Sequence, residues 1–156
     1  MTDPTDPAAS AERQHWISLL ARAPAAELER HWHAYTERNP APSWTRLRGP
    51  EPGMVMLRGR VGGDGQPFNM GEMTVTRCSV RLAQGPVGHG YAPGLADQHA
   101  ELAAVVDGLM QDPAASEGLR ALILEPLASA LGAKADAAAR RAAATQVEFF
   151  TLVRGA

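Results

Sequence analysis

The stretch GEMTVTRCSVRL, residues 71–82, decides the fold because it alternates with the period of two that is typical of a β-strand. The face expected to pack against a core carries Thr74, Thr76, Cys78, Val80 and Leu82. The opposite face carries Met73, Val75, Arg77, Ser79 and Arg81. A purely solvated face does not usually combine arginines with large apolar side chains, so we expect something to cover it.

Neighbouring segments extend this strand into an antiparallel sheet. The segments 42–48 and 53–61 precede it, the turn GGDG lies at 62–65, and PVGHGYAPG follows at 86–94. The connections are too short for parallel crossovers, so a meander is expected. With ordinary register, Val55 and Leu57 share the core face, and Met54 and Met56 lie on the other. The arginines expected on that other face are Arg46, Arg48, Arg58, Arg60, Arg77 and Arg81.

Helices are expected both before and after the strands along the chain. Ser10 is a plausible N-cap for a first helix, Pro24 opens a second, and Asp97 opens the clearest one, at 97–112. Residues 133–144 are helical by propensity, 119–131 fit either a helix or a strand, and 145–155 favour a closing strand. The sum is an α+β fold, with 1–9 as a flexible leader and 10–156 as a single domain.

Composition narrows the function classes. The chain has 156 residues and a net charge of -2. This net charge does not favour binding to nucleic acids or to a membrane surface. Cys78 is the single cysteine, which excludes an internal disulfide and a multi-cysteine metal site, and fits a reducing cytoplasm. Residues 42–82 hold six arginines against three carboxylates, a net of +3, so the remainder carries -5. The start of the chain lacks the pattern of a signal peptide.

The arginine-bearing face allows three interpretations. The protein's own helices and water cover it, or another subunit does, or Arg58, Arg60, Arg77 and Arg81 bind a polyphosphate or phosphonate through bidentate contacts. His89 stands between two glycines, which permit close approach of a ligand or of neighbouring backbone, and which equally suit a bulge.

The remaining candidates have both structural and chemical interpretations. His99 is expected to border the core of its helix, with a direct chemical role as the alternative, and Asp97 lies at the edge of the same region. Cys78 fits a small buried hydrophobe better than a nucleophile. The sequence shows no compact catalytic constellation, no H-x-x-x-H pair for a metal, and no phosphate-binding loop with its lysine in GGDGQPF.

Five stretches in order resemble one family, the PhnG family, which is the G subunit of the bacterial carbon–phosphorus lyase system. They are RQHWISLLA at 13–21, GEMTVTRCSVRL at 71–82, GHGY at 88–91, DQHAELAAVVDGLMQD at 97–112 and VEFFTLVRG at 147–155. One departure concerns the residue after Gly94, which is often basic in the family and is Leu95 here.

The resemblance implies a subunit that works with H, I and J proteins, on which a K protein docks. Their complex attaches an alkylphosphonate to the ribose of ATP, with Mg, and expels adenine to give α-D-ribose 1-methylphosphonate 5-triphosphate. An iron–sulfur cluster belongs to the J partner, and no cofactor is expected on this chain. The alternative role is a non-catalytic scaffold. In either role, Arg77 and Arg81 would meet a partner subunit or, with His89, an anionic substrate.

Overall fold

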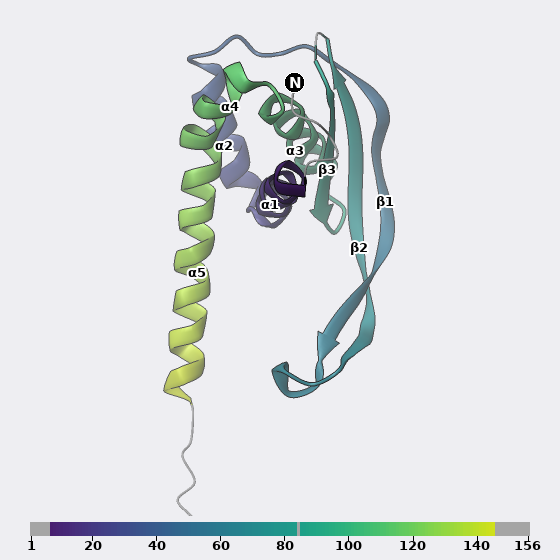
Figure 1. Ribbon diagram of the computed structural model, residues 1–156, viewed down its shortest axis with the longest axis vertical. Helices are drawn as coiled ribbons and strands as arrows, with labels where there is room; N and C mark the ends of the chain where they lie inside the picture. Colours follow the sequence, from purple (N-terminus) through teal and green to yellow (C-terminus); the bar gives the residue numbers. More distant parts are fainter. Residues whose placement is uncertain (1–6, 84, 146–156) are drawn as a thin grey trace, which may run out of the picture.

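The computed structural model describes residues 7–83 and 85–145, which form one three-stranded antiparallel sheet and a layer of helices. Figure 1 shows the helices gathered on one side of the sheet. The elements in order are α1 (Pro7–Arg22), α2 (Ala25–Thr36), β1 (Trp44–Arg60), a 3-10 turn (Val61–Gly63), β2 (Pro67–Leu82), β3 (Val87–Pro93), α3 (Asp97–Met110), α4 (Pro113–Leu119), a π-helical turn (Arg120–Leu124) and α5 (Glu125–Ala144). The predicted α+β fold and the meander order β1-β2-β3 are confirmed.

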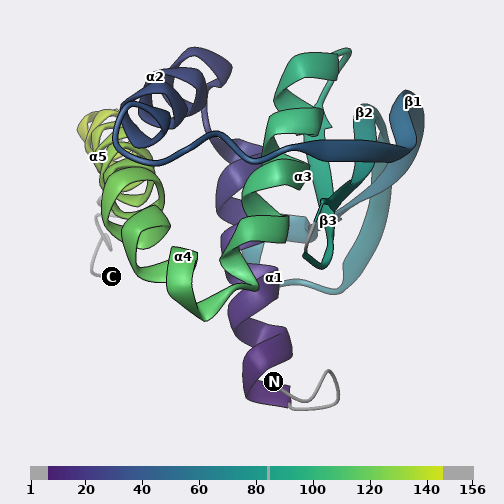
Figure 2. The same cartoon turned by 90° about the horizontal axis from the view of Figure 1, so that it is seen from above.

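Helix α3 lies between the sheet and helices α2, α4 and α5, as the view from above shows (Figure 2), whereas α1 packs beside α3 directly against β3. One side of α3 packs on β2 and β3 in a cluster of Cys78, Val80, Leu82, Ala92, Ala100, Ala104 and Val105. Its other side joins a helical cluster with Trp16, Leu20, Leu28, Ile123 and Leu127 at its centre. The predicted core face of 71–82 is therefore confirmed from Thr76 to Leu82.

Two glycines of β3 allow α3 to approach the sheet at backbone distance. A Cβ atom added at Gly88 would fall on the carbonyl of Ala104, and one added at Gly90 would fall on the carbonyl of Ala100. The glycines beside His89 therefore serve the packing of the protein's own helix. Of the alternatives that the sequence left open for these glycines, the structure shows close approach of neighbouring backbone, which belongs to α3.

The register of β1 corrects the predicted faces. The segments 42–48 and 53–61 form one continuous strand, with irregularities on both sides of Arg48. Arg46 stands opposite Val80 and so points to the helical side, where its guanidinium binds Glu101. Beyond the irregular stretch, Val55 stands opposite Met73, which places Val55 on the outer face instead of the core face. A one-residue shift reverses every side chain that follows, and this explains the error.

One further boundary is corrected, one ambiguous stretch is resolved, and one expected strand falls outside the described residues. Helix α1 already begins at Pro7, so Ser10 is not its N-cap. The ambiguous stretch 119–131 is helical, because the Glu125 N–H donates to the carbonyl of Arg120 in a π-helical turn. Pro126 then stands in the first turn of α5, where a proline is tolerated. The expected closing strand lies, from residue 146 on, outside the described residues.

We expect the close approach between β3 and α3 to make Gly90→Ala strongly destabilising. The added methyl group meets backbone atoms, which cannot rotate away, so about 3 kcal/mol or more should be lost from the free energy of unfolding. Urea unfolding of the purified chain measures the loss. Gly49→Ala in β1 is the matched control, since its Cβ meets nothing within 4 Å. Equal stability of the two variants would contradict the prediction.

Candidate functional site

Five polar side chains meet on the outer face of the sheet, which is the face turned away from α3. Ser79 of β2 is at their centre, opposite Arg48 of β1 on one side and His89 of β3 on the other. Arg77 and Arg81 flank Ser79 along β2, two residues away in each direction, and so share its face. We call this group the outer-face cluster: Arg48, Arg77, Ser79, Arg81 and His89. The register thus brings Arg77, Arg81 and His89 together, as the sequence suggested.

The outer-face cluster carries more positive than negative charge. The Arg77 Nε donates to Glu51 at 2.8 Å, and the Arg48 Nε lies 3.5 Å from the same carboxylate oxygen. Arg81 is exposed, and no carboxylate of the described residues forms an ion pair with it. Three guanidinium groups therefore face one carboxylate, which leaves capacity for a further anion.

His89 is oriented for binding. Its ring Nδ1 lies 2.9 Å from the Ser79 hydroxyl. Asp107 contacts His89 only through the backbone N–H, at 2.8 Å, so it does not orient the ring. A serine–histidine pair without an orienting acid on the ring lacks the third member of a catalytic triad. The arrangement fits recognition of an oxyanion better than nucleophilic attack.

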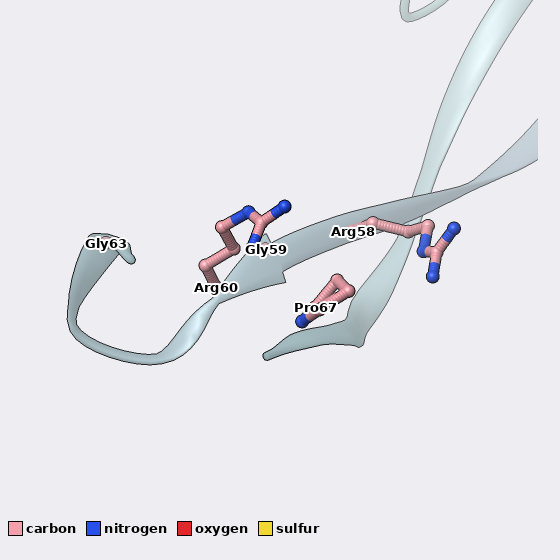
Figure 3. Close-up of a pocket in the computed structure, with 5 residues that line it drawn as sticks. All are labelled: Arg58, Gly59, Arg60, Gly63 and Pro67. Carbon is pink, nitrogen blue, oxygen red and sulfur yellow. The ribbon is translucent and has the colours of Figure 1, made fainter. Parts of the chain in front are cut away.

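Arg58 and Arg60 lie apart from the outer-face cluster, at the far end of the β1–β2 hairpin, where they pair with Asn69 and Pro67. Together with Gly59, Gly63 and Pro67 they line a shallow hollow of about 470 Å³ (Figure 3). The Arg60 Nη1 donates to the carbonyl of Gly65 at 3.1 Å, and so closes the turn. The sequence grouped these two arginines with Arg77 and Arg81, whereas the structure separates them into a second cationic site.

A buried carboxylate that the sequence analysis missed joins three elements. Asp107 of α3 is fully buried and accepts from the Arg13 guanidinium at 2.7 and 3.1 Å, and from the Trp16 indole at 2.8 Å. It also accepts from the His89 backbone N–H. The available signal was an aspartate directly after the apolar run AAVV in the best amphipathic helix. Its role is structural, because every contact is to the protein itself.

The other predicted candidates take structural positions. His99 is buried at the border of the core, and its Nε2 lies 2.8 Å from the carbonyl of Leu20. Asp97 is exposed at the first position of α3. Cys78 is buried and its thiol donates to the carbonyl of Arg48 at 3.3 Å. Burial raises the pKa of this thiol, which disfavours the thiolate that nucleophilic catalysis requires.

Glu101 of α3 links the helical layer to the start of β1. It accepts from the Arg46 guanidinium at 2.7 and 2.8 Å and from the Trp44 indole at 2.9 Å. The hydrogen bond from Arg46, supported by the one from Trp44, lowers the pKa of the Glu101 carboxyl below its ordinary value of 4.5.

Two classes of site are absent from the described residues. Within 7–83 and 85–145, no three histidine, cysteine, aspartate or glutamate side chains gather as metal ligands would. In the same part of the chain, no helix combines the length and apolar character needed to cross a bilayer.

Comparisons with known proteins agree with the resemblance read from the sequence. The family model described as "Phosphonate metabolism protein PhnG" matches residues 11–155. A protein from Rhizobium meliloti (strain 1021) is 45% identical over 151 residues, which cover 97% of this chain and 94% of the relative. That relative is named the PhnG subunit of alpha-D-ribose 1-methylphosphonate 5-triphosphate synthase.

We expect Asp107→Asn to lower the free energy of unfolding by about 3 kcal/mol. The neutral amide leaves the Arg13 guanidinium without its buried counter-charge. Its NH₂ group also faces N–H groups that donate to the carboxylate in the wild-type chain, and it cannot accept from them. Urea unfolding gives the loss. Asp136→Asn, at an exposed position of α5, makes the same chemical change and should be close to neutral. Two indistinguishable unfolding curves would show that the buried ion pair adds nothing.

The lowered pKa of Glu101 sets a pH dependence. When folding lowers the pKa of a carboxyl group, the ionised group adds to the free energy of unfolding. The full contribution is present at a pH above the group's ordinary pKa, and it is lost as the pH falls through the lowered pKa of the folded state. The wild-type chain should therefore exceed Glu101→Gln in stability at neutral pH, and the difference should shrink below the ordinary value of 4.5. Unfolding curves of both proteins across this range test it, and a difference independent of pH would be the contrary result.

Proposed function

Because this chain belongs to the PhnG family of phosphonate metabolism proteins, we propose that it is a subunit of α-D-ribose 1-methylphosphonate 5-triphosphate synthase. The observation that supports this is the identity of 45% to a protein of that name over nearly the whole length of both chains. The activity is a transferase-type reaction of the complex, in which an alkylphosphonate displaces adenine from ATP. The subunit alone is expected to be inactive.

The partners follow from the family. The proposed assembly contains the I, H and J subunits of the carbon–phosphorus lyase core complex, with the K protein docking on it. ATP, bound with Mg, is a substrate of the complex, and the iron–sulfur cluster resides in the J subunit. This chain needs no cofactor of its own. A cytoplasmic location is proposed because ATP is a substrate.

In this assembly the outer-face cluster binds an anionic group of the substrates, the triphosphate or the phosphonate. The support is its geometry: Arg48, Arg77 and Arg81 surround the Ser79–His89 pair, and one carboxylate offsets three guanidinium groups. A planar guanidinium matches the oxygens of a phosphate or phosphonate through paired hydrogen bonds. The cluster contributes binding groups, and neighbouring subunits complete the site and supply the reactive ones.

A scaffold role is the second candidate. It is favoured by Glu51, which already accepts from Arg77 and lies near Arg48, so that part of the positive charge is compensated within the chain. A carboxylate of a neighbouring subunit would then complete the pairing, and the outer-face cluster would serve assembly only.

Alanine variants of Arg77 and Arg81 separate these roles in the reconstituted complex. We expect normal recovery of the complex with each variant, and kcat/KM for adenine release reduced about tenfold or more, since a hydrogen bond to a charged group is worth about 1.5–3 kcal/mol. Arg38→Ala, at an exposed position of the turn after α2, is the control.

Three results are distinguishable. Intact assembly with reduced turnover supports substrate binding by the outer-face cluster. Loss of assembly assigns the arginines to the subunit contact and supports the scaffold role. Assembly and turnover equal to those of the control would exclude both roles for these two side chains.

A further inference from the structure

The β1–β2 hairpin extends well past β3, α1 and α3, as Figure 1 shows. β3 pairs with β2 only from Val75 to Arg81, so the sheet has two strands beyond that point. We call residues 54–73 the arm. None of them is buried. A two-stranded ribbon is marginally stable in water, so an arm of this length is typical of a segment that packs against something else.

Apolar side chains cover both faces of the arm. Val55 pairs with Met73 on one face, and Met54 and Met56 lie on the other, opposite Thr74 and Glu72. Of the eleven large apolar side chains that are exposed among the described residues, seven lie in the arm: Met54, Val55, Met56, Leu57, Val61, Phe68 and Met70. Soluble chains rarely leave so much apolar surface together in water, whereas methionine-rich surfaces are common at binding sites.

The edges of the arm are also open, in contrast to the other edge of the sheet. At β3 the His89 N–H is bound by Asp107, and the carbonyl of Val87 accepts from Arg13 and Gln111. Near the body, β1 carries Pro50 and Pro52, which lack the N–H that a further strand would need. From Met54 to Arg60 no proline interrupts β1, and β2 lacks β3 as its neighbour. An open, apolar edge invites pairing with another chain.

The charged side chains of the arm predict the charge of the surface that it binds. Arg58 and Arg60 line the hollow at its tip, and within the described residues Arg58 forms no ion pair (Figure 3). The arm's own carboxylates, Asp64 and Glu72, do not line this hollow. A matching surface must therefore be apolar where it meets the strands and must carry a carboxylate where it meets the hollow.

From these observations we propose that the arm docks in an apolar groove, rimmed by carboxylates, on another subunit of the synthase. This inference rests on the proposed function, because it requires that the chain acts in an assembly. The arm supplies the buried apolar anchors of the contact, and the two arginines fix its register by pairing with acidic groups of the partner. The contact is separate from the outer-face cluster, which lies on the three-stranded part of the sheet.

Threonine substitutions in the arm test the apolar contact. Met56→Thr with Leu57→Thr removes one large side chain from each face and keeps a residue type that suits a strand. We expect the Kd for the partner subunits, purified without this chain and immobilised, to rise at least about tenfold. Leu47→Thr with Leu95→Thr makes the same kind of change at exposed leucines outside the arm and should leave the Kd unchanged.

Charge reversal tests the tip. Arg58→Glu should weaken binding at least about tenfold and slow association, whereas Arg38→Glu in the turn after α2 should not. Thermal unfolding of every variant alone should match the wild type, because the substituted side chains are exposed. Hydrogen exchange provides a measurement on the unaltered chain: the amides of 54–60 should gain protection on assembly.

Each outcome decides a different point. If the wild-type chain binds none of the partner subunits, the proposed function fails. If it binds them and the arm variants bind equally well, with amides 54–60 unprotected, the arm proposal alone is overturned. If the arm variants only abolish self-association of the isolated chain, the occupant is a second copy, and the proposal is likewise overturned.

Discussion

The buried carboxylate of Asp107 is the constraint on which the arrangement of the layers depends. An unpaired charge in a protein interior costs several kcal/mol, so the groups that satisfy it are held in place. Arg13 and Trp16 bring α1 to this point, and the His89 N–H brings β3. One side chain of α3 therefore fixes both the helix packed at the edge of the sheet and the edge itself. The close approach of α3 to Gly88 and Gly90 follows from the same placement.

The sheet is completed by its own chain at one edge and left incomplete elsewhere. Asp107, Arg13 and Gln111 satisfy the outward polar groups of β3. The arm has neither such partners nor a covering helix among the described residues, and its side chains are apolar on both faces. The contrast lies within one sheet of one molecule, so it cannot be attributed to a general shortage of polar residues. It indicates that the missing cover comes from outside the described residues.

Sequence periodicity predicted the parts of the fold in which local pattern and packing agree. The alternation of 71–82 placed Thr76, Cys78, Val80 and Leu82 in the core correctly, because every second side chain there is small or apolar. The same reasoning failed for Val55, because the irregularities near Arg48 shift the register, and no local propensity records a register shift. A continuous pattern is required before alternation can be carried from one segment to the next.

The candidate site shows the same division between local and long-range information. His89 was recognised by its flanking glycines, but its pairing with Ser79 depends on the register between two strands. Asp107 was visible as a polar residue after an apolar run, yet its partners on α1 lie 91 and 94 residues away in sequence. Such contacts are set by the packing of whole elements. They become predictable only when the relative positions of α1, α3 and β3 are known.

The titratable side chains are divided between a structural interior and a chemical surface. His99, Cys78 and Asp107 are buried and each holds a hydrogen bond within the protein, whereas the outer-face cluster remains open to water. Guanidinium groups bind an anion more strongly when water is excluded, because the effective dielectric constant falls. The exposed face therefore gains strength as a substrate site only once another protein covers it.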